Sequence, residues 1–521
     1  MLACLPPMRL AIASSLLFAT RVAAAQPDVA PPDAPPTPPP AEPVPEKLPT
    51  PTTVESKVVP PSAPAEAKPA EPVRGPDEGF RFGSYGRLIA GTDLRGGKPE
   101  RLLVGAVGPR VVEPSYLELE MSYGFETKRG IRLRPIITLA FDGTLFHETG
   151  QFDAHPALRN MYLDATLTSK VSAWVGSRMY RGDDIYLFDY WPLDDQNTVG
   201  GGLVVRSAEL GAKDNGDVLE LAGHVGFNRL DNPFQFQQVA VANPEQGATI
   251  VDQLNRERVI ASATASYLMM RDPKLPSMKL KVHGEVHSLP SGTRARTDES
   301  GAPTGQLESL PGDSGYLIGA EVSLFGRSTV GYRDHLNLFA RYAKGLAAFD
   351  ELAPPTSFGT DLKTTNASEL SFGLSGNYDT AFGNCMVGAL SRRFIDADDN
   401  PVDHDDGWEY ALDARPLAKV LPDVFVGADI SYQARFPRGL NPFTERAEDP
   451  AIFQIAPMIV YSPMGPSAYD RPQLRAVMSI AHLNQGALDA YVPDDPRHAH
   501  GTVYYLGLQA EWWFNSSNYK H

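Results

Sequence analysis

Apolar and polar residues alternate one by one along several stretches of this chain. In YLELEMSYG, residues 116–124, leucine, methionine and tyrosine alternate with glutamate and serine. In MKLKVHGEVH, residues 278–287, methionine, leucine and valine alternate with lysine, histidine and glutamate. A period of two places the two sets on opposite faces of an extended chain. The pattern predicts β-strands with one apolar face and one polar face.

The length of these segments and their loops bears on the fold. Clusters of Gly, Asp, Asn and Pro separate the segments, and two loops, SLPSGTRARTDESGAPTGQLESLPGDS and DADDNPVDHDDGW, are long and polar. Strands of a soluble sandwich also alternate but are more often about five or six residues long, whereas a tilted transmembrane barrel needs about nine to eleven. At roughly 24 residues per strand and loop, the roughly 440 residues after the first 78 make about 16 to 18 strands. We therefore predict an all-β fold, a transmembrane antiparallel β-barrel.

The N-terminus has the pattern of a secretory signal. MRLAIASSLLFATRVAAAQP contains Arg9, an apolar run of roughly ten residues and the small residues Ala23-Ala24-Ala25. A helical membrane anchor would need about 20 apolar residues. Residues 1–25 are predicted to be a signal peptide cleaved after Ala25.

The next segment is compositionally distinct. Residues 26–78 are rich in proline, alanine and glutamate, as in PPDAPPTPPPAEPVPEKLPTP. Proline fixes its backbone angle and lacks a donor, so this stretch favours extended, solvated conformers and reads as a linker. An alternative role for this arm is contact with the cell wall or a periplasmic partner. The barrel is predicted over residues 79–514, followed by a polar C-terminal tail, residues 515–521.

Composition narrows the function. The 521 residues carry a net charge of -16, which excludes a nucleic-acid binder that works through a basic surface. Of the two cysteines, Cys4 lies in the predicted signal, so Cys385 alone remains and no disulfide framework or cysteine zinc site is expected.

Three motifs resemble catalytic or metal-binding motifs, but the rest of the sequence does not favour those functions. GDSGY, residues 312–316, matches a protease nucleophile motif, but no matching histidine segment precedes it. His283 and His287 would share a face of a helix, but on a strand they lie about 13 Å apart, so we interpret them as solvated pore-facing residues. DADDNPVDHDDGW has carboxylates for calcium but lacks the glycine and closing glutamate of an EF-hand, which favours an acidic extracellular loop. No catalytic residue set, cofactor or metal site is predicted.

The closing segment YLGLQAEWWF contains three adjacent aromatic residues. Alternation places Trp513 inward beside Glu511. The opposite face, predicted to meet lipid and its interfacial zone, holds Leu506, Leu508, Ala510, Trp512 and Phe514.

Four segments together resemble the maltoporin family of sugar-conducting outer-membrane porins: FRFGSYGRLIAGT, WVGSRMYRGDDIYLFDYW, RPQLRAVMSIAHLN and GLQAEWWF. They occur in the family's order and at similar distances from the barrel ends, so the resemblance spans Gly79 to Phe514. It implies an 18-stranded homotrimeric barrel in a Gram-negative outer membrane, with maltodextrin-like sugars sliding along a file of aromatic rings. A pyranose has an apolar face and an edge of hydroxyls, so rings beneath it and polar groups beside it suit its passage.

The resemblance also implies two sets of saccharide contacts. The implied rings of the aromatic slide and the constriction are Tyr85, Tyr116, Phe152, Trp191 and Trp513. The implied polar track consists of Arg87, Glu118, Arg159, Asp184 and Asp189. A shift of one residue in the alignment with the family would assign the constriction role to Tyr190 instead of Trp191. Ile318 and Val420 stand where the family has slide aromatics, which implies an interrupted slide.

The expected function is passive diffusion of maltose and maltodextrin-like saccharides across the outer membrane, without covalent chemistry. Saccharides and outer-membrane lipids are the expected partners. One alternative is a general or ion-conducting porin with a degenerate slide. Another is a structural envelope protein without an open lumen, which the proline-rich arm would suit, whereas a barrel enzyme would need a catalytic set that we cannot assemble.

Overall fold

The computed structural model describes residues 78–144, 150, 153–208, 216–272, 275–297, 303–326, 334–400 and 402–516. The predicted signal peptide, all but the last residue of the predicted linker, and Phe152 lie outside the described residues.

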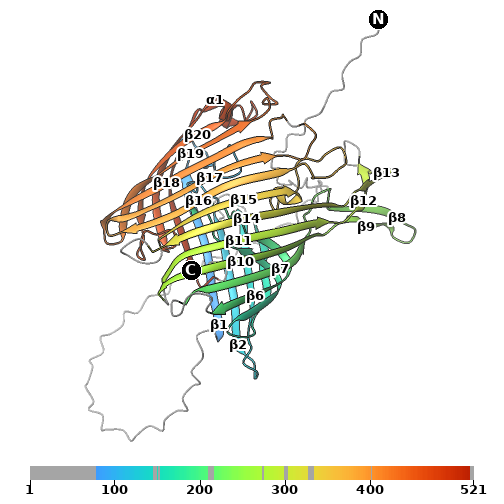
Figure 1. Ribbon diagram of the computed structural model, residues 1–521. Helices are drawn as coiled ribbons and strands as arrows, with labels where there is room; N and C mark the ends of the chain where they lie inside the picture. The colour runs from blue at the N-terminus through green and yellow to red at the C-terminus, as the bar shows by residue number, and fades with distance from the viewer. Residues whose placement is uncertain are drawn as a thin grey trace, which may run out of the picture. The chain divides into compact units, whose positions relative to one another are not determined.

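The described chain forms a closed barrel of 18 antiparallel strands (Figure 1). Each barrel strand pairs with the next one along the chain, and β1 pairs with β22 to close the sheet. This confirms the predicted fold. The barrel strands are β1 (Gly79–Thr92), β2 (Tyr116–Glu126), β3 (Arg132–Thr144), β4 (Asp153–Thr166), β5 (Val171–Arg181), β6 (Asp195–Ala208), β7 (Val218–Asn228), β10 (Arg258–Asp272), β11 (Leu275–Leu289), β14 (Asp313–Phe325), β15 (His335–Gly345), β16 (Ser368–Thr380), β17 (Gly383–Ile395), β18 (Gly407–Leu421), β19 (Val424–Pro437), β20 (Ala451–Tyr461), β21 (Gln473–Leu483) and β22 (Thr502–Phe514).

Side chains alternate between the lumen and the outer surface along these strands. On β2, Glu118, Glu120 and Ser122 are buried in the lumen, while Met121 and Tyr123 are exposed on the outside. Most of the outward residues are large and apolar, and many are more than half exposed, among them Val175, Val225, Val282, Ile459 and Leu508. An apolar outer band of this extent is stable against lipid rather than water.

The two ends of the barrel differ in their connections. Short turns join β16 to β17 and β18 to β19, and the first residue of β1 and the last residue of β22 lie at this same end. Long loops occupy the other end and include two further hairpins, β8 (Phe236–Asn243) with β9 (Gly247–Asn255) and β12 (Gly292–Thr297) with β13 (Pro303–Leu310), which extend beyond β10 and β11 (Figure 1). Short turns are typical of the periplasmic side of such barrels.

Helices are few and short. They are η2 (Tyr186–Phe188), η3 (Leu346–Ala348), α1 (Gln485–Leu488) and η4 (Pro496–Ala499). Within the described part of the chain, none of them is long and apolar enough to cross a membrane.

Three connecting segments fold into the lumen. We call residues 93–115 the front loop, residues 182–194 the constriction loop, and residues 462–472 the inner turn. Ile185, Leu187 and Phe188 of the constriction loop are at most 2% exposed and share a core with Met386 and Leu390 of β17. This apolar contact fills one side of the lumen and fixes the constriction loop against the wall.

A glycine on the wall makes this close contact feasible. A Cβ atom at Gly388 of β17 would lie 3.2 Å from Ile185 Cγ2 and 3.3 Å from Leu187 Cβ. The constriction loop therefore rests on backbone at this point, and a larger residue would displace it.

Candidate functional site

Two cavities in the lumen meet at the constriction loop. The periplasmic cavity has a volume of about 740 Å³ and the outer cavity a volume of about 320 Å³. Arg181, Asp189 and Trp191 line both of them. These three side chains therefore mark the narrow passage between the two halves of the lumen.

The backbone of the constriction loop is tied in two places. The Ile185 amide donates to the Tyr190 carbonyl at 2.7 Å, which closes a tight turn around η2. The Arg110 amide of the front loop donates to the Leu187 carbonyl at 3.0 Å. Asp189 follows η2 with φ of 55°, a left-handed conformation that aspartate tolerates better than most residues. The turn presents the Asp189 side chain to the passage.

Trp191 lies at the passage with a cation on its ring. The Arg181 guanidinium carbon is 3.6 Å from the ring centroid, and Arg181 also pairs with Asp195 at 2.8 Å. Tyr190 lines the outer cavity, where its hydroxyl accepts a hydrogen bond from Arg341 at 3.2 Å. The structure thus places Trp191, and not its neighbour, where both cavities meet.

Three of the predicted slide rings stand side by side on adjacent strands. Tyr85 of β1 lies between Tyr116 of β2 and Trp513 of β22, with ring centroids 6.0 Å and 6.4 Å apart. Tyr85 pairs in register with Trp513 and with Glu118, so its ring lies between those of its neighbours. The sheet closure, which joins the two ends of the chain, creates this row.

Arginine side chains cover the outer rings of the row. Arg87 and Arg159 lie over Tyr116, with guanidinium carbons 5.4 Å and 5.5 Å from its centroid. Arg471 of the inner turn lies 4.3 Å over Trp513. Stacked guanidinium groups keep their in-plane donors available for acceptors beside the rings.

Four residues of the predicted polar track lie beside these rings. Arg87 pairs with Asp189 at 3.4 Å and with Glu113 at 3.1 Å. Arg159 pairs with Glu118, and the Tyr116 hydroxyl donates to Glu118 at 2.7 Å. Charged groups of both signs thus flank the ring row.

Glu511 joins four segments that the sequence patterns left separate. Its carboxylate accepts from Arg475 of β21 and Arg471 of the inner turn, both at 2.7 Å, and from Arg110 of the front loop at 3.2 Å. Tyr186 of the constriction loop also donates to it, at 3.4 Å. Strand alternation had placed Glu511 inward, but no periodic signal marked Arg110 or Arg471, because both lie in irregular segments.

Asp184 and Asp189 differ in charge state although both belong to the constriction loop. Burial raises the pKa of Asp184 to about 7, and the nearby carboxylates of Asp189 and Asp183 add to this, against the effect of Arg110. Burial would also raise the pKa of Asp189, but the guanidinium groups of Arg110 and Arg87 lower it below its ordinary value. Asp189 is therefore ionised at neutral pH, whereas Asp184 gains its charge as the pH rises through about 7.

This difference predicts a pH-dependent ion preference. Above a pH of about 7 the ionised Asp184 adds a negative charge to the periplasmic cavity, so the ratio of cation to anion permeability should rise across that range. Reversal potentials in planar bilayers under a salt gradient measure the ratio. Asp184→Asn should remove the step, and Asp164→Asn, which removes a carboxylate of the same cavity paired with Arg134, should retain it. A step of wild-type size in the Asp184→Asn variant would refute the assignment.

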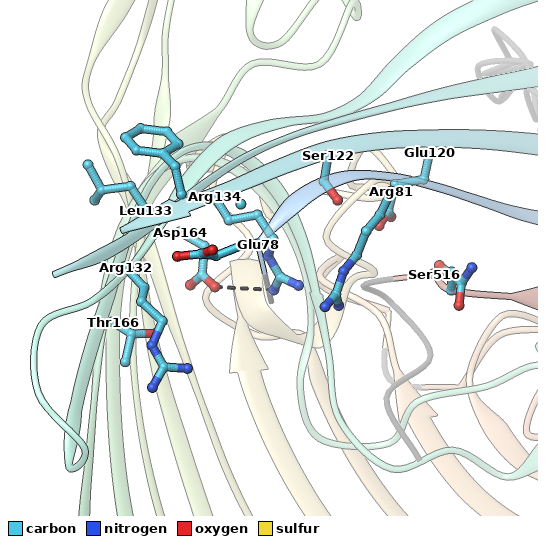
Figure 2. Close-up of a pocket in the computed structure, with 13 residues that line it drawn as sticks. Glu78, Arg81, Glu120, Ser122, Arg132, Leu133, Arg134, Asp164, Thr166 and Ser516 are labelled. Carbon is cyan, nitrogen blue, oxygen red and sulfur yellow. Dashed lines mark hydrogen bonds and ion pairs between the residues drawn. The ribbon is translucent and has the colours of Figure 1, made fainter. Parts of the chain in front are cut away.

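The periplasmic cavity continues toward the rim of the barrel. Asp164 and Thr166 line it together with a third cavity of about 410 Å³. Figure 2 shows this rim cavity, where Arg81, Arg132 and Arg134 project among acidic side chains and Arg134 pairs with Asp164 at 3.2 Å. The periplasmic mouth therefore carries both signs of charge.

Three sequence-based expectations need correction. Ile318 and Val420, 56% and 55% exposed, do not interrupt a lumen slide, because Ile318 faces outward on β14 while its neighbour Leu317 faces the lumen, and Val420 lies on the exposed periplasmic end of β18. A displacement of one residue reverses the face of a strand side chain. His283 and His287 do face the lumen but are buried rather than solvated, and both bond Glu285, at 2.7 Å and 2.9 Å.

The acidic loop between β17 and β18 lies at the long-loop end. Carboxylate oxygens of Asp396, Asp398 and Asp403 lie within 4.8 Å of one another. The same residues accept hydrogen bonds from the amides of Asp398, Asn400 and Asp405. These hydrogen bonds hold the loop in its conformation, and the carboxylates act here as acceptors for backbone amides of the same loop.

Comparisons with known proteins give one match to a family model and distant likenesses to solved structures. A family model described as LamB porin matches residues 112–514. No curated protein sequence matches the chain. Among solved structures, the outer membrane protein opdK from Pseudomonas aeruginosa is 12% identical with a TM-score of 0.41, covering 84% of this chain and 98% of that chain. The outer membrane channel DcaP of Acinetobacter baumannii is 10% identical with a TM-score of 0.39, at 84% and 98% coverage. With its closed 18-stranded barrel and the family match over most of its length, the chain is an outer-membrane porin of the Gram-negative type and belongs to the LamB porin family.

Proposed function

We propose that this porin lets maltose and maltodextrin-like saccharides diffuse passively across the outer membrane. The observation that carries the proposal is the row of Tyr116, Tyr85 and Trp513 beside the constriction, with neighbouring centroids 6.0 Å and 6.4 Å apart. A pyranose ring placed over such a row exchanges one flat apolar contact for the next as it moves. Each contact is weak, so the sugar can enter and also leave.

The arginines over the rings have a part in this passage. An incoming sugar would displace Arg87 or Arg159 from the ring face of Tyr116, and their donors would then reach its hydroxyl groups. A cation over an aromatic ring contributes about 2 kcal/mol or more when it is desolvated, as these largely buried arginines are, and the stacking and hydrogen bonds of the sugar have to offset this. Transport of this kind needs no covalent chemistry and no energy source.

A second function, conduction of ions and small solutes without sugar preference, is favoured by a specific observation. Tyr116, Trp191 and Trp513 each carry a guanidinium over the ring, at 5.4, 3.6 and 4.3 Å. If the arginines hold these positions against sugars, the rings offer no stacking face. Measurements with added sugar separate the two functions.

Replacing Trp513 or Tyr116 with Ala should weaken sugar block several-fold while ion conductance stays nearly unchanged, because each variant removes one flat contact and no charge. The readout is the reduction of single-channel current by maltooligosaccharides in planar bilayers. Trp512→Ala is the matched control, since Trp512 lies on the opposite face of β22 and donates to Ser84. Equal block in wild type and both lumen variants would reject the slide.

We further propose a homotrimer, as the resemblance to maltoporins implies, with saccharides and outer-membrane lipids as partners. Cross-linking in detergent followed by mass measurement checks the trimer. A mass equal to one chain would contradict it. We also propose that the proline-rich arm, residues 26–78, contacts the cell wall or a periplasmic partner. Binding of isolated cell wall by the protein with and without that arm tests this contact, and equal binding would contradict it.

A further inference from the structure

Arg178 of β5 differs from three other cations inside the periplasmic cavity in its surroundings. Arg181 pairs with Asp195 at 2.8 Å, Lys279 with Asp183 at 2.6 Å, and Lys281 with Asp194 at 2.9 Å. Arg178 also lines this cavity, yet within the described part of the chain no carboxylate or other acceptor bonds its guanidinium. It is a lumen cation that forms no ion pair within the described part of the chain.

Three aromatic rings hold Arg178 in place. Its guanidinium carbon lies 4.9 Å from the ring centroid of Tyr162, 5.1 Å from Trp174 and 5.0 Å from Tyr180. Trp174 is itself fixed, because His224 stacks on it at 5.3 Å and Tyr162 meets it edge-on at 6.1 Å. A guanidinium held by rings is oriented in advance and has its planar fork of donors left for an incoming anion.

Several acids that line the same cavity are paired with other cations. Glu220 pairs with Arg206 at 2.5 Å, and Asp183 and Asp194 are engaged by the two lysines. The cavity, about 740 Å³, falls in the range of about 300 to 1,000 Å³ usual for ligand sites. Arg178 therefore has a charge without an ion-pair partner and a guanidinium position set by three rings. The cavity beside it has room for a ligand.

We propose that Arg178 is a binding station for the carboxylate of an acidic saccharide, a hexuronate, on its way through the periplasmic cavity. The fork of Arg178 accommodates the carboxylate through two parallel hydrogen bonds, and the wall that carries Tyr180 and Trp191 meets the sugar body. The inference rests on the proposed function in taking the permeant to be a saccharide, and it adds a preference for acidic over neutral sugars at this second station.

The test compares current block by D-glucuronate and by maltotriose in planar bilayers. A charge-assisted hydrogen bond contributes about 1.5 to 3 kcal/mol, so Arg178→Gln should raise the half-blocking concentration of glucuronate about tenfold or more. The half-blocking concentration of glucuronate for Arg178→Lys should lie between those of the wild type and Arg178→Gln, because an ammonium group keeps the charge but not the planar pair of donors. Maltotriose block should change little in both variants, and acetate should block far more weakly than glucuronate in the wild type.

Lys170→Gln is the matched control. Lys170 is an exposed residue of the turn between β4 and β5 that lines the same cavity, so this change removes one positive charge away from the rings. An equal loss of glucuronate block in Lys170→Gln and Arg178→Gln would overturn the binding station, because it would show that glucuronate responds to the total positive charge of the cavity and not to Arg178 itself. Unchanged glucuronate block in Arg178→Gln, or acetate block as strong as that of glucuronate, would also overturn it.

The two proposals fail in different ways. Block by maltotriose without block by glucuronate would overturn the station and support the slide. Block by glucuronate that depends on Arg178, without block by maltotriose, would overturn the slide and support the station.

Discussion

Replacing Glu511 with Gln is expected to widen the lumen and to shift the channel toward anion conduction. The 4% exposed carboxylate accepts from Arg110, Arg471 and Arg475, which lie on three different segments. Removing one partner of a buried ion pair costs about 3 to 5 kcal/mol, because the remaining charges lose their neutralisation without regaining water. Three arginines then repel one another, and the front loop and the inner turn lose their common anchor.

Single-channel conductance and reversal potential measure this effect. Both should change in the Glu511→Gln variant, with conductance rising and the reversal potential moving toward that of the anion. Glu120→Gln is the control, since Glu120 is an inward acid of β2 near the periplasmic rim that accepts from Thr138. A Glu511→Gln channel with wild-type conductance and selectivity would show that Glu511 does not hold the constriction.

Replacing Phe188 with Ala should release the constriction loop from the wall. Phe188 is 2% exposed and belongs to the core that joins the loop to β17. Truncating a buried phenylalanine costs about 3 to 5 kcal/mol. Ile185 and Leu187 keep their contacts with this core, so we expect the loop to leave the wall more often without being lost from it, with larger and noisier conductance and weaker sugar block.

A second variant reaches the same contact from the barrel wall. Gly388→Val leaves the constriction loop unchanged but introduces atoms where a Cβ would already lie 3.2 Å from Ile185. It should reproduce the effect of Phe188→Ala. Gly223→Ala is the control, because the space at Gly223 is open and its nearest neighbour, the Ser262 carbonyl oxygen, is 3.9 Å away. Quiet, wild-type conductance in both Phe188→Ala and Gly388→Val would contradict this role of the loop.

Alternation predicted the face of most strand residues correctly. In β22 the period of two placed Trp513 inward and Leu508 outward, and the structure agrees. On strands where polar and apolar residues do not clearly alternate, positions matched through the resemblance could be wrong by one residue. Ile318 was matched to a position where the family has a slide aromatic, but the neighbouring Leu317 is the residue that faces the lumen, because a displacement of one position reverses the face.

What the sequence alone determined is the all-β barrel, its approximate number of strands and the lumen face of each patterned strand. These follow from local rules, because the alternation of polar and apolar residues within each strand determines which side chains face the lumen. The same alternation recurs along the strands of the barrel. The tertiary structure alone decided which contacts hold the constriction and the ring row together. The front loop, the constriction loop and the inner turn have no period, and their contacts join residues that are hundreds of positions apart, as Arg110 and Glu511 do. Such contacts depend on which segments fill the lumen together, and only the closed barrel brings them within reach.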